Sequence, residues 1–128
     1  SKKTFGYVGN TVYQIEKLLF AEKKRIRNKI FYIGDMPPIK ISQWANEIAK
    51  IGNVNKPKTI PIYIFKFFAI FGDLFNKIGI KFPMTSYRLK NMTTDQVYNL
   101  QDTYNVCGDP PYNMKNAIEN TLNWISNN

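Results

Sequence analysis

The chain has 128 residues, enough for one domain with a modest hydrophobic core, and its 44% hydrophobic and 15% aromatic content argues against disorder. It has no histidine and one cysteine, which excludes Ser-His-Asp and Cys-His catalysis, imidazole metal sites and any internal disulfide. The formal charge of +9 favours an anionic partner. Because Lys, Asn and Ile are abundant and arginine is rare, we interpret this charge as compositional bias and expect no nucleic acid as a partner.

The first third of the chain predicts a helix followed by a strand. The helix is expected to begin at Asn10, as its N-cap, and to run to about residue 22. The charged segment 22–29 is expected to be solvated, and the apolar run 30–33, which ends at Gly34, predicts a short strand. The residues that carry the helical spacing are Val12, Ile15, Leu18 and Leu19.

Two further helices are predicted in the middle of the chain. The first is expected to be capped by Ser42 and to end at Gly52. The second is expected to begin with Pro61 in its first turn and to stop at Gly79. Apolar residues surround most of this second helix, so we expect it to be buried on several sides or to lie at an interface.

The last third is predicted to alternate irregular segments with helices. Residues 80–91 are expected to be irregular, and the spacing of Thr93 and Gln96 matches a capping box that would begin a helix. A turn is predicted at 108–111, and Asn113 is expected to cap the last helix. The fold class predicted for residues 1–128 is α+β: one mostly helical subdomain with two or three short strands. Such strands do not form a stable sheet alone, so at least one is expected to extend a larger sheet.

Four landmarks occur in a fixed order along the chain. They are FGYVGN at 5–10, FYIGD at 31–35, PMTSYRLKNM at 83–92 followed by TTDQ, and AIENTLNWI at 117–125. In this order the sequence resembles the C-terminal third of the extended short-chain dehydrogenases/reductases, the family of NAD-dependent sugar-nucleotide epimerases and dehydratases.

The resemblance implies that the chain is the substrate-binding subdomain of such an enzyme, without its NAD-binding Rossmann half. The parent would use NAD to oxidise a sugar hydroxyl, alter a neighbouring centre and usually return the hydride, as in isomerases of polysaccharide biosynthesis. The implied partners are a nucleotide-sugar substrate and the missing Rossmann half. The chain alone is expected to be inactive and not to bind NAD. The sugar, the base, the reaction type and the oligomeric state are left open.

The resemblance also implies substrate-binding residues. Arg88 matches an arginine that grips the substrate diphosphate, a role that suits the bidentate guanidinium. Asn91 stands where the family has an acid that bonds the nucleotide ribose, and an amide oxygen accepts the same bond without the charge. Lys3 matches, in charge alone, a basic residue that faces the diphosphate.

No residue of this chain is expected to be catalytic, to bind a cofactor or to bind a metal. Tyr13 and Lys17 have the Tyr-x-x-x-Lys spacing of the family's catalytic pair, but they follow the 5–10 landmark, which in the family comes after that pair. We therefore interpret them as structural. The glycine-rich Gly-x-Gly-x-x-Gly turn of dinucleotide-binding folds does not occur in this sequence.

A second hypothesis treats the chain as a stand-alone basic module. The aromatic helix at 61–78 would then attach to a membrane surface or a partner protein. Its apolar run is too short to span a bilayer, so no transmembrane segment is predicted, and without a visible signal peptide the expected location is cytoplasmic. If the chain is a fragment, it leaves apolar surface of this helix without a partner, so we expect the isolated chain to self-associate through it, with Phe67 and Phe71 at the contact.

Overall fold

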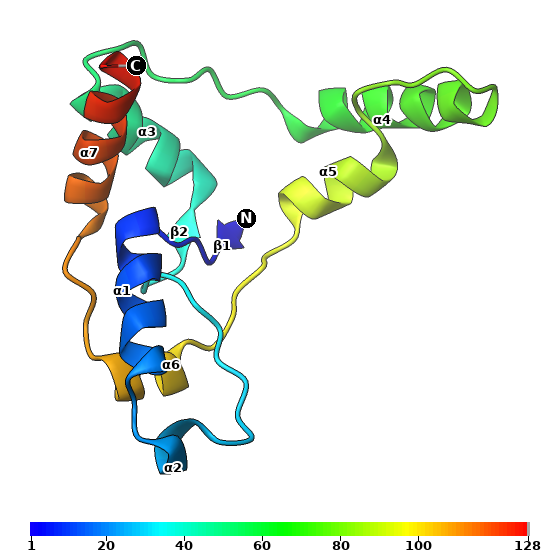
Figure 1. Ribbon diagram of the computed structural model, residues 1–128. Coiled ribbons are helices and arrows are strands. Elements are labelled where there is room, and N and C mark those ends of the chain that lie inside the picture. The colour runs from blue at the N-terminus through cyan, green and yellow to red at the C-terminus, as the bar shows by residue number, and fades with distance from the viewer. Residues whose placement is uncertain (128) are drawn as a thin grey trace. The chain divides into compact units, whose positions relative to one another are not determined.

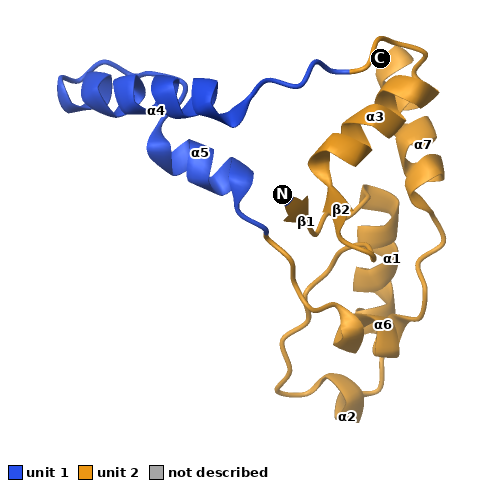
Figure 2. Cartoon of the chain, turned by 180° about the vertical axis from the view of Figure 1, so that it is seen from behind, with its two compact units in different colours: residues 1, 57–95 blue, residues 2–56, 96–128 orange. Residues whose placement is uncertain are grey.

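The computed structural model describes residues 1–127, which divide into two compact units (Figures 1 and 2). Unit 2 contains residues 2–56 and 96–127, and unit 1 contains residue 1 and residues 57–95. The structure is mostly helical with two short antiparallel strands. This confirms the mostly helical α+β class, and each unit is described below by itself.

The sheet of unit 2 is small. Strand β1 (Lys2–Lys3) pairs antiparallel with β2 (Ile39–Lys40), so that Lys3 lies opposite Ile39. Gln96 forms a parallel bridge to Lys3 and extends the pairing by one residue. Two strands of two residues do not make an independently stable sheet, so helix packing and side-chain bonds hold the unit together.

The strand predicted at residues 30–33 is wrong, because this segment is irregular. Side chains rather than a neighbouring strand satisfy its backbone. The Thr103 hydroxyl donates to the Tyr32 carbonyl at 2.7 Å, and the Gln14 side chain takes both backbone groups of Gly34. An apolar run of four residues does not by itself say whether its backbone will find a strand partner.

Helix α1 (Val8–Leu19) has its N-cap three residues before the predicted cap. Tyr7 is its N-cap residue, without a side-chain capping bond, so the prediction that Asn10 caps this helix is wrong. Asn10 lies one turn inside α1, where its buried side chain bonds to other segments. Helix α1 packs against α6 (Gln101–Cys107), whose last turn is followed by Gly108 at a φ of 74°.

The charged segment 22–29 contains the single-turn helix α2 (Lys23–Ile26), which has no buried residue. Helix α3 (Ile41–Ile51) follows β2 directly. Its N-cap residue is Lys40, so the prediction of Ser42 as its cap is wrong, whereas its predicted end at Gly52 is confirmed.

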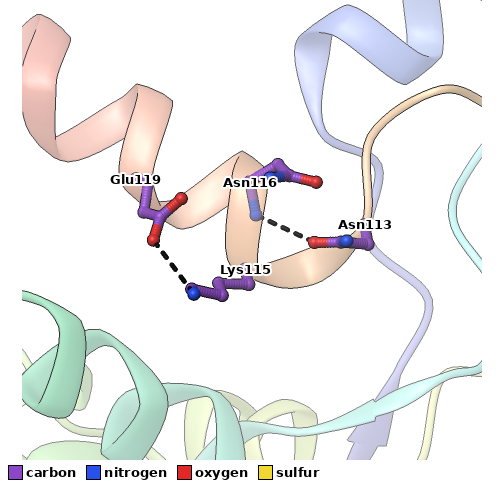
Figure 3. Close-up of polar contacts among 4 residues, drawn as sticks. All are labelled: Asn113, Lys115, Asn116 and Glu119. Atoms are coloured by element: carbon purple, nitrogen blue, oxygen red, sulfur yellow. Dashed lines mark hydrogen bonds and ion pairs between the residues drawn. The ribbon is translucent and has the colours of Figure 1, made fainter.

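Helix α7 (Met114–Ser126) packs against α3 and closes unit 2. The predicted cap is confirmed, because the Asn113 side-chain oxygen accepts from the Asn116 N–H at 2.9 Å (Figure 3). In the same helix, Lys115 and Glu119 form an i,i+4 ion pair at 3.7 Å. Both side chains are exposed, so this pair adds only about 0.3–0.5 kcal/mol.

The core of unit 2 is unusually polar. Its largest fully buried side chains are those of Gln14, Asn10 and Thr103. Apolar burial around them comes from Ala49, Leu100, Cys107 and Ile118. Because a buried amide without partners costs free energy, the fold of unit 2 depends on hydrogen bonds to these polar groups as well as on apolar contact.

Unit 1 is a pair of helices, α4 (Ile62–Lys77) and α5 (Ser86–Thr93), that pack on each other. Helix α4 begins at Ile62 with Pro61 as its N-cap residue, so the prediction that Pro61 lies in its first turn is wrong, whereas the predicted stop at Gly79 is confirmed. Gly79 has a φ of 81°, its N–H bonds the Asn76 carbonyl, and the N–H of Ile80 bonds the Phe75 carbonyl. These two bonds form a Schellman motif, which favours glycine at this position.

The prediction that residues 80–91 are irregular is wrong in its second half, because α5 begins at Ser86. The Thr85 hydroxyl oxygen accepts from the Arg88 N–H at 3.3 Å and caps α5. The predicted capping box is also wrong: Thr93 ends α5, with its hydroxyl donating to the Leu89 carbonyl, and no helix begins at Gln96. A threonine hydroxyl bonds a preceding carbonyl as readily as a following N–H, so spacing alone did not fix its role.

Candidate functional site

Two of the predicted substrate-binding residues lie on α5 of unit 1. Arg88 and Asn91 are both exposed and stand three residues apart, which places them on one face of the helix. Arg88 Nη1 donates to the Pro83 carbonyl at 2.7 Å, and its backbone N–H donates to Thr85. The Pro83–Thr85 segment therefore positions the arginine while using one of the five N–H groups of its guanidinium.

The third predicted residue, Lys3, belongs to unit 2. It lies on β1 between Ile39 and Gln96, and its exposure is only 7%. Arg88 and Asn91 thus come from one unit and Lys3 from the other, and the substrate roles of all three stay predictions.

Unit 2 contains a polar network that the sequence did not reveal. The Asp35 carboxylate accepts from the Tyr7 N–H at 2.8 Å and from Asn10 Nδ2 at 2.9 Å. Asn10 also exchanges two bonds with the backbone of Tyr112, at 2.7 and 3.0 Å. The amide of Asn10 therefore ties the start of α1 to two segments that are 25 and 102 residues away in sequence.

A second buried amide holds the landmark at 31–35 in place. Gln14 Nε2 donates to the Gly34 carbonyl at 2.7 Å, and Gln14 Oε1 accepts from the Gly34 N–H at 3.0 Å. A Cβ atom on Gly34 would lie 2.9 Å from Thr4 Cγ2, so glycine is needed for this close approach. The landmarks at 5–10 and 31–35 are packed together through these contacts and through the bond from the Asp35 N–H to the Phe5 carbonyl.

The orientation of α1 explains why sequence reasoning missed these residues. Asn10 and Gln14, one turn apart, face the interior of unit 2, while the apolar side chains on the opposite face are exposed. The periodicity revealed an amphipathic helix but gave no sign that its polar face would point inward. The exposed apolar stripe of α1 consists of Val8, Val12, Ile15 and Leu19.

Unit 2 also has a half-open cavity of about 920 Å³ between α3, α7 and the loops beside them. Aromatic pairs line it: Phe5 stacks on Trp44 at 5.2 Å, and Tyr7 meets Tyr112 edge-on at 5.3 Å. Among the described residues that line it, Asp35 and Asp109 are charged and none is cationic. The cavity is therefore unsuited to a diphosphate, despite the positive charge of the chain.

The other side chains of unit 2 that could take part in a reaction are engaged in contacts within the fold or are buried. The Tyr13 hydroxyl donates to the Cys107 carbonyl at 3.0 Å, and Lys17 Nζ lies 5.4 Å from the Tyr13 ring centroid. Burial raises the pKa of the Cys107 thiol, which makes it a poor nucleophile. Burial likewise raises the pKa of Tyr104, whose hydroxyl oxygen accepts from the Met36 N–H.

No cluster of three or more metal-ligating side chains occurs within residues 1–127. Over the same residues, no helix combines the length and apolar character needed to cross a membrane. Comparison of the chain with models of known protein families, with curated proteins and with solved structures finds no match.

Proposed function

We propose that this chain is the substrate-binding part of an NAD-dependent nucleotide-sugar epimerase or dehydratase, and that it is inactive without its NAD-binding half. Its role is to hold the diphosphate end of the nucleotide sugar, with Arg88 as the anion-binding group and Asn91 beside it on α5. The choice of family follows the resemblance given by the order of the four landmarks in the sequence.

The observation that carries the proposal is the exposed apolar stripe of α1. Within this stripe, Val8, Val12 and Ile15 repeat at helical spacing, and all three are exposed although α1 is anchored in unit 2 by its opposite face. A continuous apolar face of this kind favours burial against another protein segment. A Rossmann half that packs on α1 would bury it and would also extend the two-residue strands of unit 2.

The charge distribution favours Arg88 as the diphosphate site and disfavours the cavity of unit 2. The cavity lining includes two carboxylates, which repel an anion, whereas Arg88 is cationic and exposed. A planar guanidinium with free N–H groups binds two phosphate oxygens at once. We therefore assign the diphosphate to Arg88 and not to the cavity.

The experiment uses the protein translated from the complete reading frame that contains this chain. We expect an upstream Gly-x-Gly-x-x-Gly and Tyr-x-x-x-Lys, and NAD binding by the complete protein but not by residues 1–128 alone. Replacement of Val12 and Ile15 by lysine should lower the melting temperature of the complete protein and leave that of the isolated chain nearly unchanged. The control places one lysine at the exposed Glu16 of the same helix.

An upstream sequence without the glycine-rich turn, or micromolar NAD binding by the 128-residue chain, would contradict the proposal. So would equal destabilisation of the complete protein and the isolated chain by the two lysines, because the stripe would then be part of the fold of unit 2 itself.

A second candidate function is attachment to a partner protein or a membrane surface through α4. It is favoured by the exposure of most apolar side chains of this helix, among them Phe67, Phe68, Ile70, Phe71 and Leu74. Phe67 and Phe71 lie with ring centroids 4.7 Å apart and form one exposed aromatic surface. A second copy of the chain is the simplest partner for such a surface.

A further inference from the structure

The end of unit 2 around α2 combines exposed apolar side chains with a net positive charge. We define the tip as residues 19–30, which contain the last residue of α1, all of α2 and the turns on either side. In Figure 2, α2 lies at one end of unit 2, while α3 and α7 lie toward the other. The tip therefore projects from the helices that form the core.

The first property is apolar exposure. Phe20 is 84% exposed, Ile30 is 81% exposed and Leu19 is 74% exposed. Phe20 and Ile30 are the two most exposed large apolar side chains of the described chain, and they flank α2 on both sides. Isolated exposed apolar residues need no explanation, but three of this size in one short projecting segment mark an interaction surface.

The second property is positive charge. This segment contains one carboxylate, that of Glu22, and five cationic side chains, which are Lys23, Lys24, Arg25, Arg27 and Lys29. Glu22 pairs with Lys24 at 2.8 Å, but both side chains are well exposed, so water screens the pair. The tip keeps a strong net positive charge that favours an anionic partner.

The tip is also held in a defined conformation. Arg25 Nη2 donates to the Asn105 carbonyl of α6 at 2.7 Å, and backbone bonds close the turns before and after α2. Asn28 adopts a φ of 58°, a left-handed conformation that asparagine tolerates well, in the turn that follows α2. Because the segment is already ordered, its binding would lose little conformational entropy.

We propose that the tip attaches the protein to an anionic membrane surface, with Leu19, Phe20 and Ile30 inserted at the headgroup boundary and the cations on the lipid headgroups. Such peripheral binding combines buried apolar area with electrostatic attraction. A nucleic acid would use the cations but would gain little from the aliphatic Leu19 and Ile30. The apolar flanks therefore favour a lipid surface over RNA or DNA.

The test measures co-sedimentation of the full chain with vesicles of phosphatidylcholine alone and of phosphatidylcholine mixed with phosphatidylglycerol. Binding is expected on the mixed vesicles and should weaken as salt rises. Lys23→Gln, Arg27→Gln and Lys29→Gln in one variant should weaken it by about fivefold for each charge removed. Arg25 is kept because it holds α2 to α6. The control variant carries Lys50→Gln, Lys56→Gln and Lys115→Gln, three exposed lysines of unit 2 whose removal gives the same net charge and should have little effect.

A second pair of variants tests the apolar contribution. Phe20→Ser with Ile30→Ser should weaken binding by about tenfold for each side chain. Val54→Ser with Ile60→Ser changes two exposed apolar residues outside the tip and should leave binding unchanged. Far-ultraviolet circular dichroism of all four variants identifies any that fail to fold, and the remaining variants decide the outcome.

Three results would overturn the proposal. Equal binding to both kinds of vesicle would show that the headgroup charge is not recognised. Equal loss in the two triple variants would show that net charge, and not the tip, causes the binding. Unchanged vesicle binding by the Phe20→Ser and Ile30→Ser variant, together with retention of an RNA oligonucleotide that the triple tip variant loses, would assign the tip to nucleic acid.

Discussion

Unit 2 and unit 1 are each stabilised internally, and the kind of contact that does so differs between them. In unit 2, buried amides connect segments far apart in sequence, as Asn10 does with Asp35 and Tyr112. In unit 1, the contacts are local: a Schellman motif ends α4, Thr85 caps α5, and Gly72 lets the backbone at Met84, just before α5, approach α4. The buried polar network of unit 2 therefore fixes contacts between segments that are distant in sequence. The local signals of unit 1 fix two helices and leave an apolar surface exposed.

The largest expected effect concerns Gln14. Replacement of Gln14 by leucine removes both hydrogen bonds to Gly34 and leaves a buried N–H and a buried carbonyl without partners. We expect the free energy of unfolding of unit 2 to fall by about 3 kcal/mol or more. Both tryptophans, Trp44 and Trp124, lie in unit 2, so urea unfolding followed by tryptophan fluorescence reports this unit alone.

The control is Glu16→Ala, which changes an exposed residue of the same helix and should leave the fluorescence midpoint within error. If Gln14→Leu behaves like this control, the buried amides do not hold unit 2, and the contrast between the two units loses its basis.

The next effect concerns Gly72, which is buried in α4. A Cβ atom at this position would collide with the Met84 carbonyl oxygen, which is backbone and cannot turn away. We expect Gly72→Ala to destabilise the packing of the segment before α5 on α4, and with it unit 1, by about 1–3 kcal/mol. Amide hydrogen exchange in α4 should accelerate, while the tryptophan transition of unit 2 stays where it was. Acceleration of the same size in Lys66→Ala, an exposed position of α4, would argue against the collision as the cause.

The exposed aromatic surface of α4 predicts self-association. Phe67→Ser with Phe71→Ser removes the tilted ring pair and should shift the chain toward a monomer in sedimentation at several concentrations. The matched control is Tyr87→Ser, an exposed aromatic of α5. A wild-type chain that stays monomeric at every concentration would show that this surface has no second copy as its partner.

The smallest effect is a pH dependence of unit 1. Hydrogen bonds from Ser86 lower the pKa of Asp73 below its ordinary value of 3.8. A lowered pKa in the folded state means that the carboxylate stabilises unit 1 above pH 3.8 and that this contribution is lost as the pH falls through the folded-state pKa. In the wild-type chain, the amides of α5 should therefore lose slightly more protection from hydrogen exchange at low pH than they do in the Asp73→Asn variant. Identical pH profiles of the two proteins would count against a stabilising role of the Ser86 bonds.

Local signals in the sequence were sufficient for parts of the fold. Gly79 and Asn113 were predicted at helix ends because a left-handed glycine and an N-cap amide act on neighbouring backbone groups. Helix α5 was missed because Leu89 is its only buried residue, so the apolar spacing that identifies a helix is weak there.

The long-range part of the fold could not be predicted in this way. An asparagine near the start of a helix caps it in many proteins, whereas Asn10 instead joins Asp35 and Tyr112. Nothing in the residues around Gln14 indicates that its amide will bond Gly34, 20 residues later. Of the candidate site, Arg88 was predicted as a phosphate ligand from resemblance, and its anchoring by the Pro83 carbonyl became visible only in the structure.

The substrate role of Arg88 is the central claim, and one calorimetric measurement tests it most directly. The complete protein is titrated with uridine and thymidine diphosphates as wild type, as Arg88→Ala and as the control Arg27→Ala, an exposed arginine of unit 2. Loss of a charge-assisted bidentate contact costs about 1.5–3 kcal/mol, so Arg88→Ala should weaken the binding of the recognised diphosphate by about ten- to one-hundred-fold. Arg27→Ala should bind it as the wild type does. Unchanged affinity in Arg88→Ala, or an equal loss in both variants, would contradict the assignment of α5 to the substrate diphosphate.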